Sequence, residues 1–332
     1  MPWPFFYLFL FEVESLKEYK TFNQQLKILR SRGLEVPTDG HPKRFLEEEN
    51  YYNVINGYKD LFLERGDDNK PVVPERYRQG THFDELKSLF LFDRELRFLF
   101  LKYILIFENS FKTVISHEFC RRYPKPNSYL EIKNYVNNNP KKVLQQISIL
   151  TKTIHDKVDK EGAIKHYIEE HGSVPLWVLV NYLTIGNLSY LFSISTDADK
   201  NVIAKSYYNK YKKQHVSDNM VRISSEDLES GLKIINLVRN KCAHDERLYN
   251  YNFRNVRVSN LAKHFELKHY DNTRIVVAIL YLKIFLDKKY FQIFHEELTK
   301  LFAEYRIRFH SVSFDEILTI MGITLDDFQL LE

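Results

Sequence analysis

Arg239 and His244 are separated by four residues, and their side chains are suited to chemistry on a phosphodiester. Histidine can both accept and donate a proton near neutral pH. Arginine remains charged and can bind two phosphate oxygens at once. Together they suit in-line attack by an RNA 2'-hydroxyl, in which His244 moves the proton and Arg239 stabilises the charge on phosphorus. No carboxylate cluster is needed, because the nucleophile belongs to the substrate.

The spacing of this pair sets a geometric condition. The pattern predicts a helix from Ser224 to about Val238, with the pair at its carboxyl end. At about 100° per residue, five residues turn about 500°, so the two side chains point about 140° apart on a regular helix. They meet only if the last turn unwinds, if the arginine stem bends round, or if a second copy supplies the partner. The alternative interpretation is a helix end with cations near its carbonyls.

The wider segment Arg-Asn-x-Cys-Ala-His-x-Glu-Arg-Leu-Tyr-Asn, starting at Arg239, resembles the signature of the AbiD/AbiF abortive-infection proteins of the HEPN superfamily. AbiF is the closer fit. Further segments resemble family blocks in the same order over roughly residues 22–253; they are 22–33, 50–58, 92–97 with Glu108-Asn109, and 174–189.

The resemblance implies a metal-independent endoribonuclease whose site forms at a two-fold interface of a homodimer. Catalysis would use Arg239 and His244, with Asn240 orienting the site. The RNA path would be lined by Lys241, Arg247, Tyr249, Asn250 and Arg254. It also implies a small structured non-coding RNA as partner, besides the target RNA, in a toxin–antitoxin arrangement and in phage defence.

The composition favours long helices, because 10 Gly and 10 Pro in 332 residues leave little room for many tight turns. We therefore expect an all-α fold, with a HEPN-like helical bundle core and N- and C-terminal helical additions. The expected domains are an N-terminal arm and small helical region (1–80), the core (81–260) and C-terminal helices packed on that core (261–332). A net charge of +4 permits RNA binding without indicating it.

Several helices can be predicted individually. The patterns indicate helices over Thr21–Arg32, Phe83–Tyr123 and Ser313–Leu331, and another that starts at Pro175 and runs through Leu183. The helix Ala198–Tyr211 mixes lysines with tyrosines, which suits single-stranded RNA or a plain solvated face.

Four polar or charged residues lie within the apolar pattern of 83–123, and their roles can be interpreted in more than one way. Glu108 or Asn109 could orient the motif, since a carboxylate on a core helix requires a cation and Arg239 is a candidate; ordinary polar packing is the alternative. Arg94 and Arg97 are interpreted as a solvated or salt-bridged face.

The remaining features exclude other classes. Cys120 and Cys242 form neither a disulfide framework nor a zinc site, which indicates a reducing, cytoplasmic compartment. Cys242 is expected to be a small buried residue. No metal site, dinucleotide motif or other cofactor motif is present in the sequence. The apolar run within residues 1–18 is too short for a membrane span, and an extended start or packing arm is expected instead.

Two other functions remain open. A non-catalytic protein could bind structured RNA through the same basic surface, with Arg239 and His244 contacting phosphate without turnover. A purely structural interaction module would bind no nucleic acid.

Overall fold

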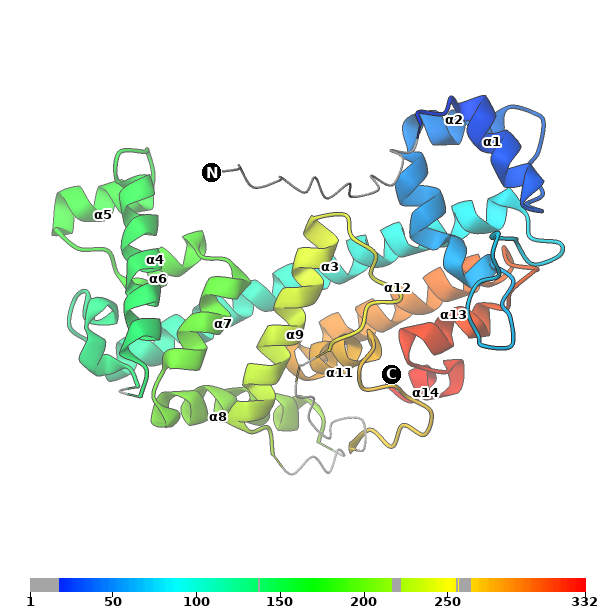
Figure 1. The fold of residues 1–332 in the computed structure, drawn as a ribbon. Coiled ribbons are helices and arrows are strands. Elements are labelled where there is room, and N and C mark those ends of the chain that lie inside the picture. The colour runs from blue at the N-terminus through cyan, green and yellow to red at the C-terminus, as the bar shows by residue number, and fades with distance from the viewer. Residues whose placement is uncertain (1–17, 137, 217–221, 255, 257–263) are drawn as a thin grey trace, which may run out of the picture. The chain divides into compact units, whose positions relative to one another are not determined.

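The computed structural model describes residues 18–332 except 137, 217–221, 255 and 257–263 (Figure 1). The expected N-terminal arm therefore lies outside the described residues, apart from residue 18. The described part of the chain is helical and has no β-strand, which confirms the all-α class. Within those same ranges, no helix is both long and apolar enough to cross a membrane. The chain divides into two compact units, residues 1–87 and 88–332.

The first unit is built from short helices and a long loop. These helices are α1 (Phe22–Ser31), α2 (His41–Glu48), the π-helix η1 (Tyr52–Asn56) and the 3₁₀ helix η2 (Lys59–Phe62). The prediction of a helix over 21–32 is confirmed. Thr21 caps α1 through a capping box with Gln24, and Gly33 follows the helix with a φ of 87°.

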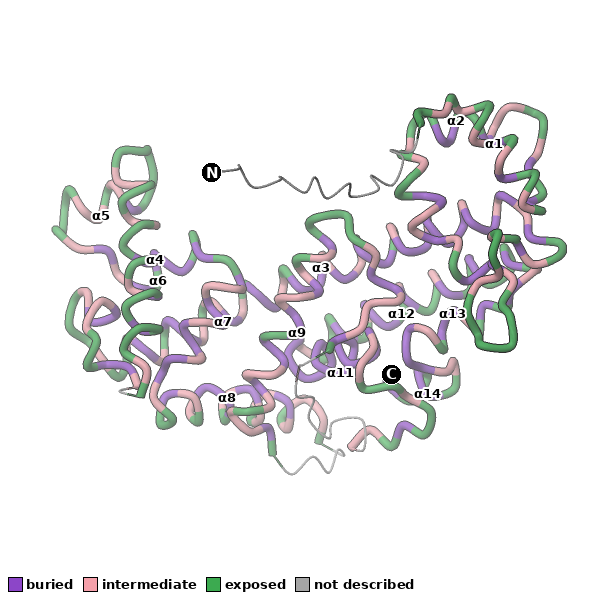
Figure 2. Tube along the Cα trace, in the orientation of Figure 1, coloured by how far each residue is buried: buried purple, intermediate pink, exposed green. Residues whose placement is uncertain are grey.

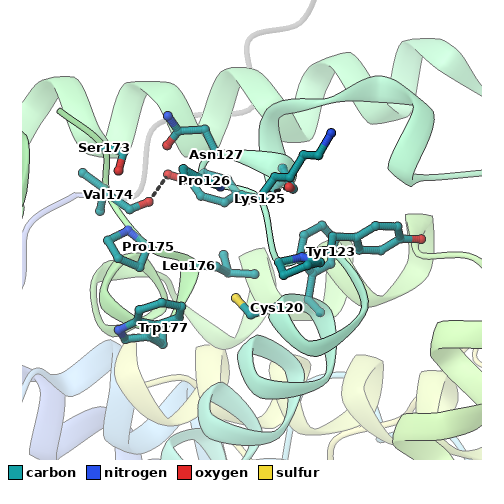
Figure 3. A pocket seen from close by; sticks show the side chains of 14 residues that line it. Cys120, Tyr123, Lys125, Pro126, Asn127, Ser173, Val174, Pro175, Leu176 and Trp177 are labelled. Atoms are coloured by element: carbon teal, nitrogen blue, oxygen red, sulfur yellow. Dashed lines mark hydrogen bonds between the residues drawn. The ribbon is translucent and has the colours of Figure 1, made fainter. Parts of the chain in front are cut away.

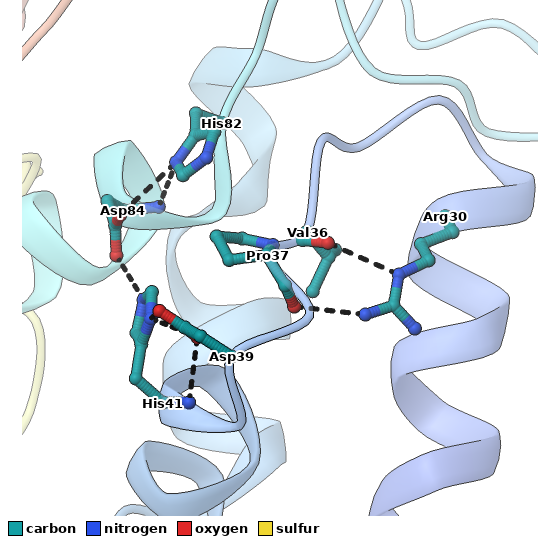
Figure 4. A network of polar contacts seen from close by, with 7 residues as sticks. All are labelled: Arg30, Val36, Pro37, Asp39, His41, His82 and Asp84. Atoms are coloured by element: carbon teal, nitrogen blue, oxygen red, sulfur yellow. Dashed lines mark hydrogen bonds and ion pairs between the residues drawn. The ribbon is translucent and has the colours of Figure 1, made fainter.

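A polar network around His41 joins parts of the first unit that are distant in sequence (Figure 4). The Nε2 atom of His41 lies 2.8 Å from Asp84 Oδ1, and its Nδ1 atom lies 2.7 Å from Asp39 Oδ1. Burial is the largest influence on the pKa of His41 and lowers it. The hydrogen bonds to Asp39 and Asp84 outweigh burial, so the pKa is raised above 6.5. The protonated imidazolium is thus the favoured link between the two carboxylates.

The second unit contains the other helices. Helix α3 (Phe83–Arg122) begins in the first unit and continues through the second. After it come η3 (Ser128–Leu130), η4 (Ile132–Asn134), α4 (Pro140–Val158), α5 (Ala163–His171), α6 (Leu176–Leu179), η5 (Val180–Tyr182), α7 (Ile185–Ile194), α8 (Asp197–Gln214), α9 (Ser225–Ala243), α11 (Val276–Phe285), α12 (Lys288–Arg306), α13 (Phe314–Met321) and α14 (Leu325–Gln329).

Helix α3 supplies one wall of the core of the second unit. It is 40 residues long and contains neither Gly nor Pro, as the pattern over 83–123 predicts. The ring of Phe92 on this helix packs edge-on against Phe314, with ring centroids 5.4 Å apart. About four helical turns further on, Phe107 stacks on Phe285 of α11 with centroids 4.6 Å apart. These contacts bury α3 against the C-terminal helices.

Helix α9 lies at the centre of the second unit, where α7, α8 and α11 pack against it (Figure 1). Ser224 caps it through a capping box with Asp227, as its position before Glu226 and Asp227 predicts. Every residue of α11 is buried (Figure 2). An apolar helix without a polar face is typical of such a central position.

The structure bears out one of two further predicted helices and divides the other. The segment from Pro175 to Leu183 is helical over α6 and the 3₁₀ helix η5, which ends at Tyr182; the separate helix α7 begins after Thr184, which forms a capping box with Asn187. The segment Ser313–Leu331 starts with a capping box of Ser313 and Glu316. It divides at Gly322, whose φ of 88° ends α13 before α14 begins.

Candidate functional site

The segment that carries Arg239 and His244 ends helix α9. The helix continues to Ala243, and the backbone N–H of His244 still donates to the carbonyl of Asn240 at 3.0 Å. Asp245 then adopts a φ of 54°, a left-handed conformation that aspartate tolerates and that ends the helix. The last turn therefore does not unwind before His244. The divergence of about 140° between the two side chains follows directly from that regular geometry.

The segment after α9 is held by a buried ion pair on α3, which we call the Asp93–Arg97 clamp. Asp93 is fully buried and accepts hydrogen bonds from the backbone N–H groups of Leu248 (3.1 Å) and Tyr249 (2.7 Å). Arg97 is 2% exposed; it donates to Asp93 at 2.7 Å and also to Asp245. The clamp thus grips the chain at Asp245, immediately after His244, and again at residues 248–249.

Burying these two charges is feasible because each has several partners. An isolated carboxylate or guanidinium would cost several kcal/mol of desolvation, whereas a paired and hydrogen-bonded one recovers much of that cost. Asp93 and Arg97 stand one helical turn apart, so a regular α3 places them side by side. The clamp fixes the backbone on the carboxyl side of His244 to the 40-residue helix α3.

Arg239 lies on α9 close to this clamp. It is half-buried, and its Nε atom is buried without a hydrogen-bond partner in the described structure. A buried guanidinium nitrogen without a partner is costly in free energy, which makes Arg239 an unusual polar group in this helical turn.

Cys242 marks the apolar side of the same helical turn. The pKa of the Cys242 thiol is raised to about 12, and burial is the largest of the causes. The positive charges of Arg97 and Arg239 act in the opposite direction on this thiol, so all three side chains share one neighbourhood. A thiol that remains protonated near neutral pH is a poor nucleophile, in keeping with a small buried residue.

His244 and Asn240, the other two predicted catalytic residues, are both exposed. None of the side-chain hydrogen bonds or ion pairs found among the described residues involves the His244 imidazole. Proton transfer to or from a bound substrate requires such an accessible ring.

The five residues predicted to line an RNA path lie in different environments. Lys241 pairs with Glu246 and covers the ring of Tyr251 at 5.0 Å, while Arg247 and Asn250 are half-buried and Arg254 is exposed. Tyr249, by contrast, is 2% exposed, because its backbone is drawn onto Asp93 and its ring enters the core. A buried ring cannot stack on an RNA base, so the role visible for Tyr249 is structural.

Glu108 finds a different cation from the one considered in the sequence. Its carboxylate pairs with Lys112, one turn along α3, at 2.9 Å. Asn109 is exposed, and its carbonyl accepts a hydrogen bond from Thr113. The ion pair of Glu108 is thus the ordinary polar packing of a helix, and the clamp takes the place considered for Glu108 and Asn109 beside the motif.

The basic and aromatic helix α8 also has a structural role. Tyr207 and Tyr211 are fully buried, and Lys210 pairs with Asp287 at 3.0 Å. The rings are therefore not available to stack on RNA. In the described residues, no group of three or more His, Cys, Asp and Glu side chains could hold a metal ion.

A family model described as Abi-like protein matches residues 44–250, which is more than half of the chain. The chain belongs to the Abi-like protein family. This membership supports a role in abortive infection, a form of defence against phage. The Abi-like range includes the clamp and the whole segment from Arg239 to Asn250, while Arg254 lies outside it. No curated protein and no solved structure matches this Abi-like chain.

The clamp was not predicted as part of the site. Its signal in the sequence is a pair of opposite charges, Asp93 and Arg97, spaced one turn apart and flanked by apolar Phe92 and Leu96. Such a pair inside an apolar helix indicates a buried ion pair. The sequence does not reveal that its other partners, Asp245, Leu248 and Tyr249, come from beyond α9.

Proposed function

We propose that this protein is an AbiF-like ribonuclease of the HEPN type, which binds a small structured non-coding RNA and cleaves RNA in anti-phage defence. The observation that carries the proposal is the end of α9. There an exposed histidine, His244, follows a half-buried arginine, Arg239, and a buried ion pair holds the segment in place. Rigid support of a proton-transfer group and a phosphate-binding cation is what phosphodiester chemistry needs.

The reaction is a transesterification within the RNA. A neutral His244 removes the proton of a 2'-hydroxyl, and the resulting oxygen attacks the adjacent phosphorus in line. The bond from phosphorus to the 5'-oxygen breaks, and a protonated His244 of the second copy gives a proton to that oxygen. Arg239 stabilises the charge that develops on the phosphoryl oxygens. The products are a 2',3'-cyclic phosphate and a 5'-hydroxyl.

A homodimer is part of the proposal for two reasons. First, α9 remains helical up to His244, so Arg239 and His244 of one copy diverge by about 140°. A second copy facing the first supplies the missing partner. Second, Phe98 and Leu105 lie on one face of α3 and are 59% and 45% exposed. Large apolar side chains exposed on one face are typical of protein–protein contacts.

The same divergence supports a second candidate, a non-catalytic protein that binds structured RNA through this surface. In that case Arg239 and His244 contact phosphates separately. Since binding of RNA depends on salt under both hypotheses, only turnover distinguishes them.

The test is cleavage of a labelled structured RNA by protein freed of bound nucleic acid, in EDTA, with wild type beside His244→Ala. Wild type should release fragments with cyclic-phosphate ends, and His244→Ala should lose this activity. The matched control is His155→Ala on α4, an equally exposed histidine that should cleave as wild type does.

Retention of RNA binding by His244→Ala together with loss of cleavage assigns proton transfer to His244. If wild type shifts the RNA on a gel but no protein cleaves it, the binding function replaces the ribonuclease. If nothing binds RNA, both candidates fail.

A further inference from the structure

A cavity of about 270 Å³ lies at the far end of α3 from the clamp (Figure 3). Its walls come from the last residues of α3, from the connection that follows, and from the segment leading into α6. Aromatic residues and prolines make up half of the lining residues, including Phe119, Tyr123, Tyr129, Pro175 and Trp177. The thiol of Cys120 lies between Trp177 on one side and Tyr123 on the other.

The walls are fixed by hydrogen bonds before any ligand arrives. The Tyr129 hydroxyl donates to the carbonyl of Val174 at 2.6 Å and ties the two sides together. Burial raises the pKa of the Cys120 thiol, while backbone hydrogen bonds from Leu176 and Trp177 act on it in the opposite direction. Preformed, mostly apolar cavities with a few polar groups are typical of small-molecule sites.

Two exposed side chains stand at the mouth. The indole of Trp177 is 55% exposed, although an indole usually buries most of its surface. Lys125 is exposed between Pro124 and Pro126, and none of the ion pairs found in the described residues includes it. An aromatic surface on one side of the cavity and a cation on the other fit a ligand that has a flat ring and a negative charge.

We propose that this cavity binds one unstacked nucleobase of the RNA, with the phosphate of that nucleotide facing Lys125; the inference rests on the proposed function. Pockets for drug-sized ligands measure about 300–1,000 Å³, so this smaller cavity suits a single base with its sugar and phosphate outside. Proteins that recognise structured RNA stack splayed loop bases on aromatic side chains in this way. Polar groups of Asn127 and Ser173 line the cavity and are available to the edge of the base.

The position of the cavity indicates how much RNA is involved. Cys120 follows Arg97 along the unbroken helix α3, which at 1.5 Å per residue places it about 35 Å from the clamp. A mononucleotide cannot reach both places, whereas a folded RNA can. The cavity would therefore select a structured RNA by one unpaired base, at a distance from the cleaved bond.

Trp177 itself provides the measurement. The chain has two tryptophans, Trp3 and Trp177, so Trp3→Phe leaves Trp177 as the only indole. This variant of the full chain is titrated with a hairpin RNA that has an unpaired loop, and with a blunt duplex without one. We expect saturable quenching of the Trp177 fluorescence by the hairpin and little by the duplex, because stacking on the indole requires an unpaired base.

Substitutions give a second readout on the same RNA. Trp177→Ala should weaken hairpin binding roughly 5- to 150-fold, the loss that corresponds to one stacked base, while Trp177→Phe should retain most of it. Lys125→Gln should reduce the slope of log affinity against log salt by about 0.7–0.9, as expected for one lost phosphate contact. Trp177 and Lys125 are both exposed, so these variants should fold.

Three outcomes would overturn the inference. In the first, the protein binds and cleaves the hairpin, but the fluorescence of Trp177 does not change and Trp177→Ala binds as tightly as wild type. The cavity would then have no part in RNA recognition, although the proposed ribonuclease activity would stand. A saturable change in Trp177 emission on adding a capped amino acid such as N-acetyl-phenylalanine amide, and none on adding RNA, would make the cavity a docking site for protein. Absence of any RNA binding would remove the inference together with the proposed function.

Discussion

The Oδ1 atom of Asp93 lies 2.7 Å from the backbone nitrogen of Tyr249, a residue 156 positions further along the chain. This contact joins the first third of α3 to the segment after α9. Because Asp93 also pairs with Arg97, and Arg97 with Asp245, the residues on the carboxyl side of His244 are anchored to one buried ion pair.

Replacing the central carboxylate should destabilise the protein. Asp93→Asn removes the charge that pairs with the buried Arg97 and leaves one acceptor for two backbone donors. We expect a loss of about 3–5 kcal/mol in the free energy of unfolding. Urea unfolding measures it, with Glu95→Gln as the control, because Glu95 is an exposed carboxylate on the same helix. A change within 0.5 kcal/mol for both variants, the usual range at the surface, would contradict the role given to the clamp.

Asp245→Gly tests whether the clamp positions His244. Glycine keeps the left-handed backbone of Asp245, at a φ of 54°, but removes the carboxylate that Arg97 binds. Since Asp245 is mostly exposed, we expect little change in unfolding temperature. Displacement of His244 by about 1 Å should lower the cleavage rate on the order of 10²-fold.

The rate and the affinity for RNA are measured together for that variant. A lower kcat with an unchanged KM fits misplacement of the imidazole. Cleavage at the wild-type rate would show that Asp245 does not position His244. Asp245→Asn keeps an oxygen acceptor, so its cleavage rate should lie between those of wild type and Asp245→Gly.

A site shared by two copies predicts poisoning by an inactive copy. Wild type mixed and re-equilibrated with excess His244→Ala should lose activity per wild-type chain, because mixed dimers lack one proton-transfer group. Phe98→Asp should separate the dimer and abolish cleavage, since a charge would enter the exposed apolar face of α3. Leu144→Asp places a charge at a similarly exposed apolar residue on α4 and serves as control. If the activity per wild-type chain stays constant as His244→Ala is added, each copy contains a complete site.

The network around His41 predicts a pH dependence of stability. The folded pKa of His41 is raised above 6.5 by Asp39 and Asp84 against the opposing effect of burial, which is the larger single influence. A raised pKa means that the folded state holds the proton more tightly than the unfolded state. The stabilisation is therefore complete below about pH 6.5 and is lost as pH rises through the folded pKa. Urea unfolding between pH 6 and 9 measures this loss, and His41→Gln should lack this component of it.

Gly231 on α9 should not tolerate a side chain. A Cβ atom there would lie 2.4 Å from a ring carbon of Phe285 and 2.6 Å from one of Tyr281, both buried on α11. Alanine favours a helix over glycine by roughly 0.5–1 kcal/mol, but overpacking costs about 1–3 kcal/mol. We expect Gly231→Ala to lower the free energy of unfolding, and Ser230→Ala, at the adjacent position, to leave it nearly unchanged. Increased stability of Gly231→Ala would mean that α11 can move away from α9.

Local patterns were sufficient to predict much of the fold. The apolar helical pattern from Phe83 to about Tyr123 predicts the long α3, and the serine before Glu226 and Asp227 predicts the start of α9. One local prediction was wrong. The single helix expected over Ser313–Leu331 is divided, because Gly322 ends α13.

The sequence by itself determined the fold class, because helix formation depends on residues close together in the chain. It also determined the chemistry available at the candidate site, because proton transfer by His244 and phosphate binding by Arg239 depend on the type of side chain. Which charge supports the motif depended on tertiary structure alone. Glu108 and Asp93 are both carboxylates on α3 with a cation one turn away. Only the packing of α9 against its neighbours brings the backbone of residues 248 and 249 to Asp93, and leaves Glu108 with Lys112.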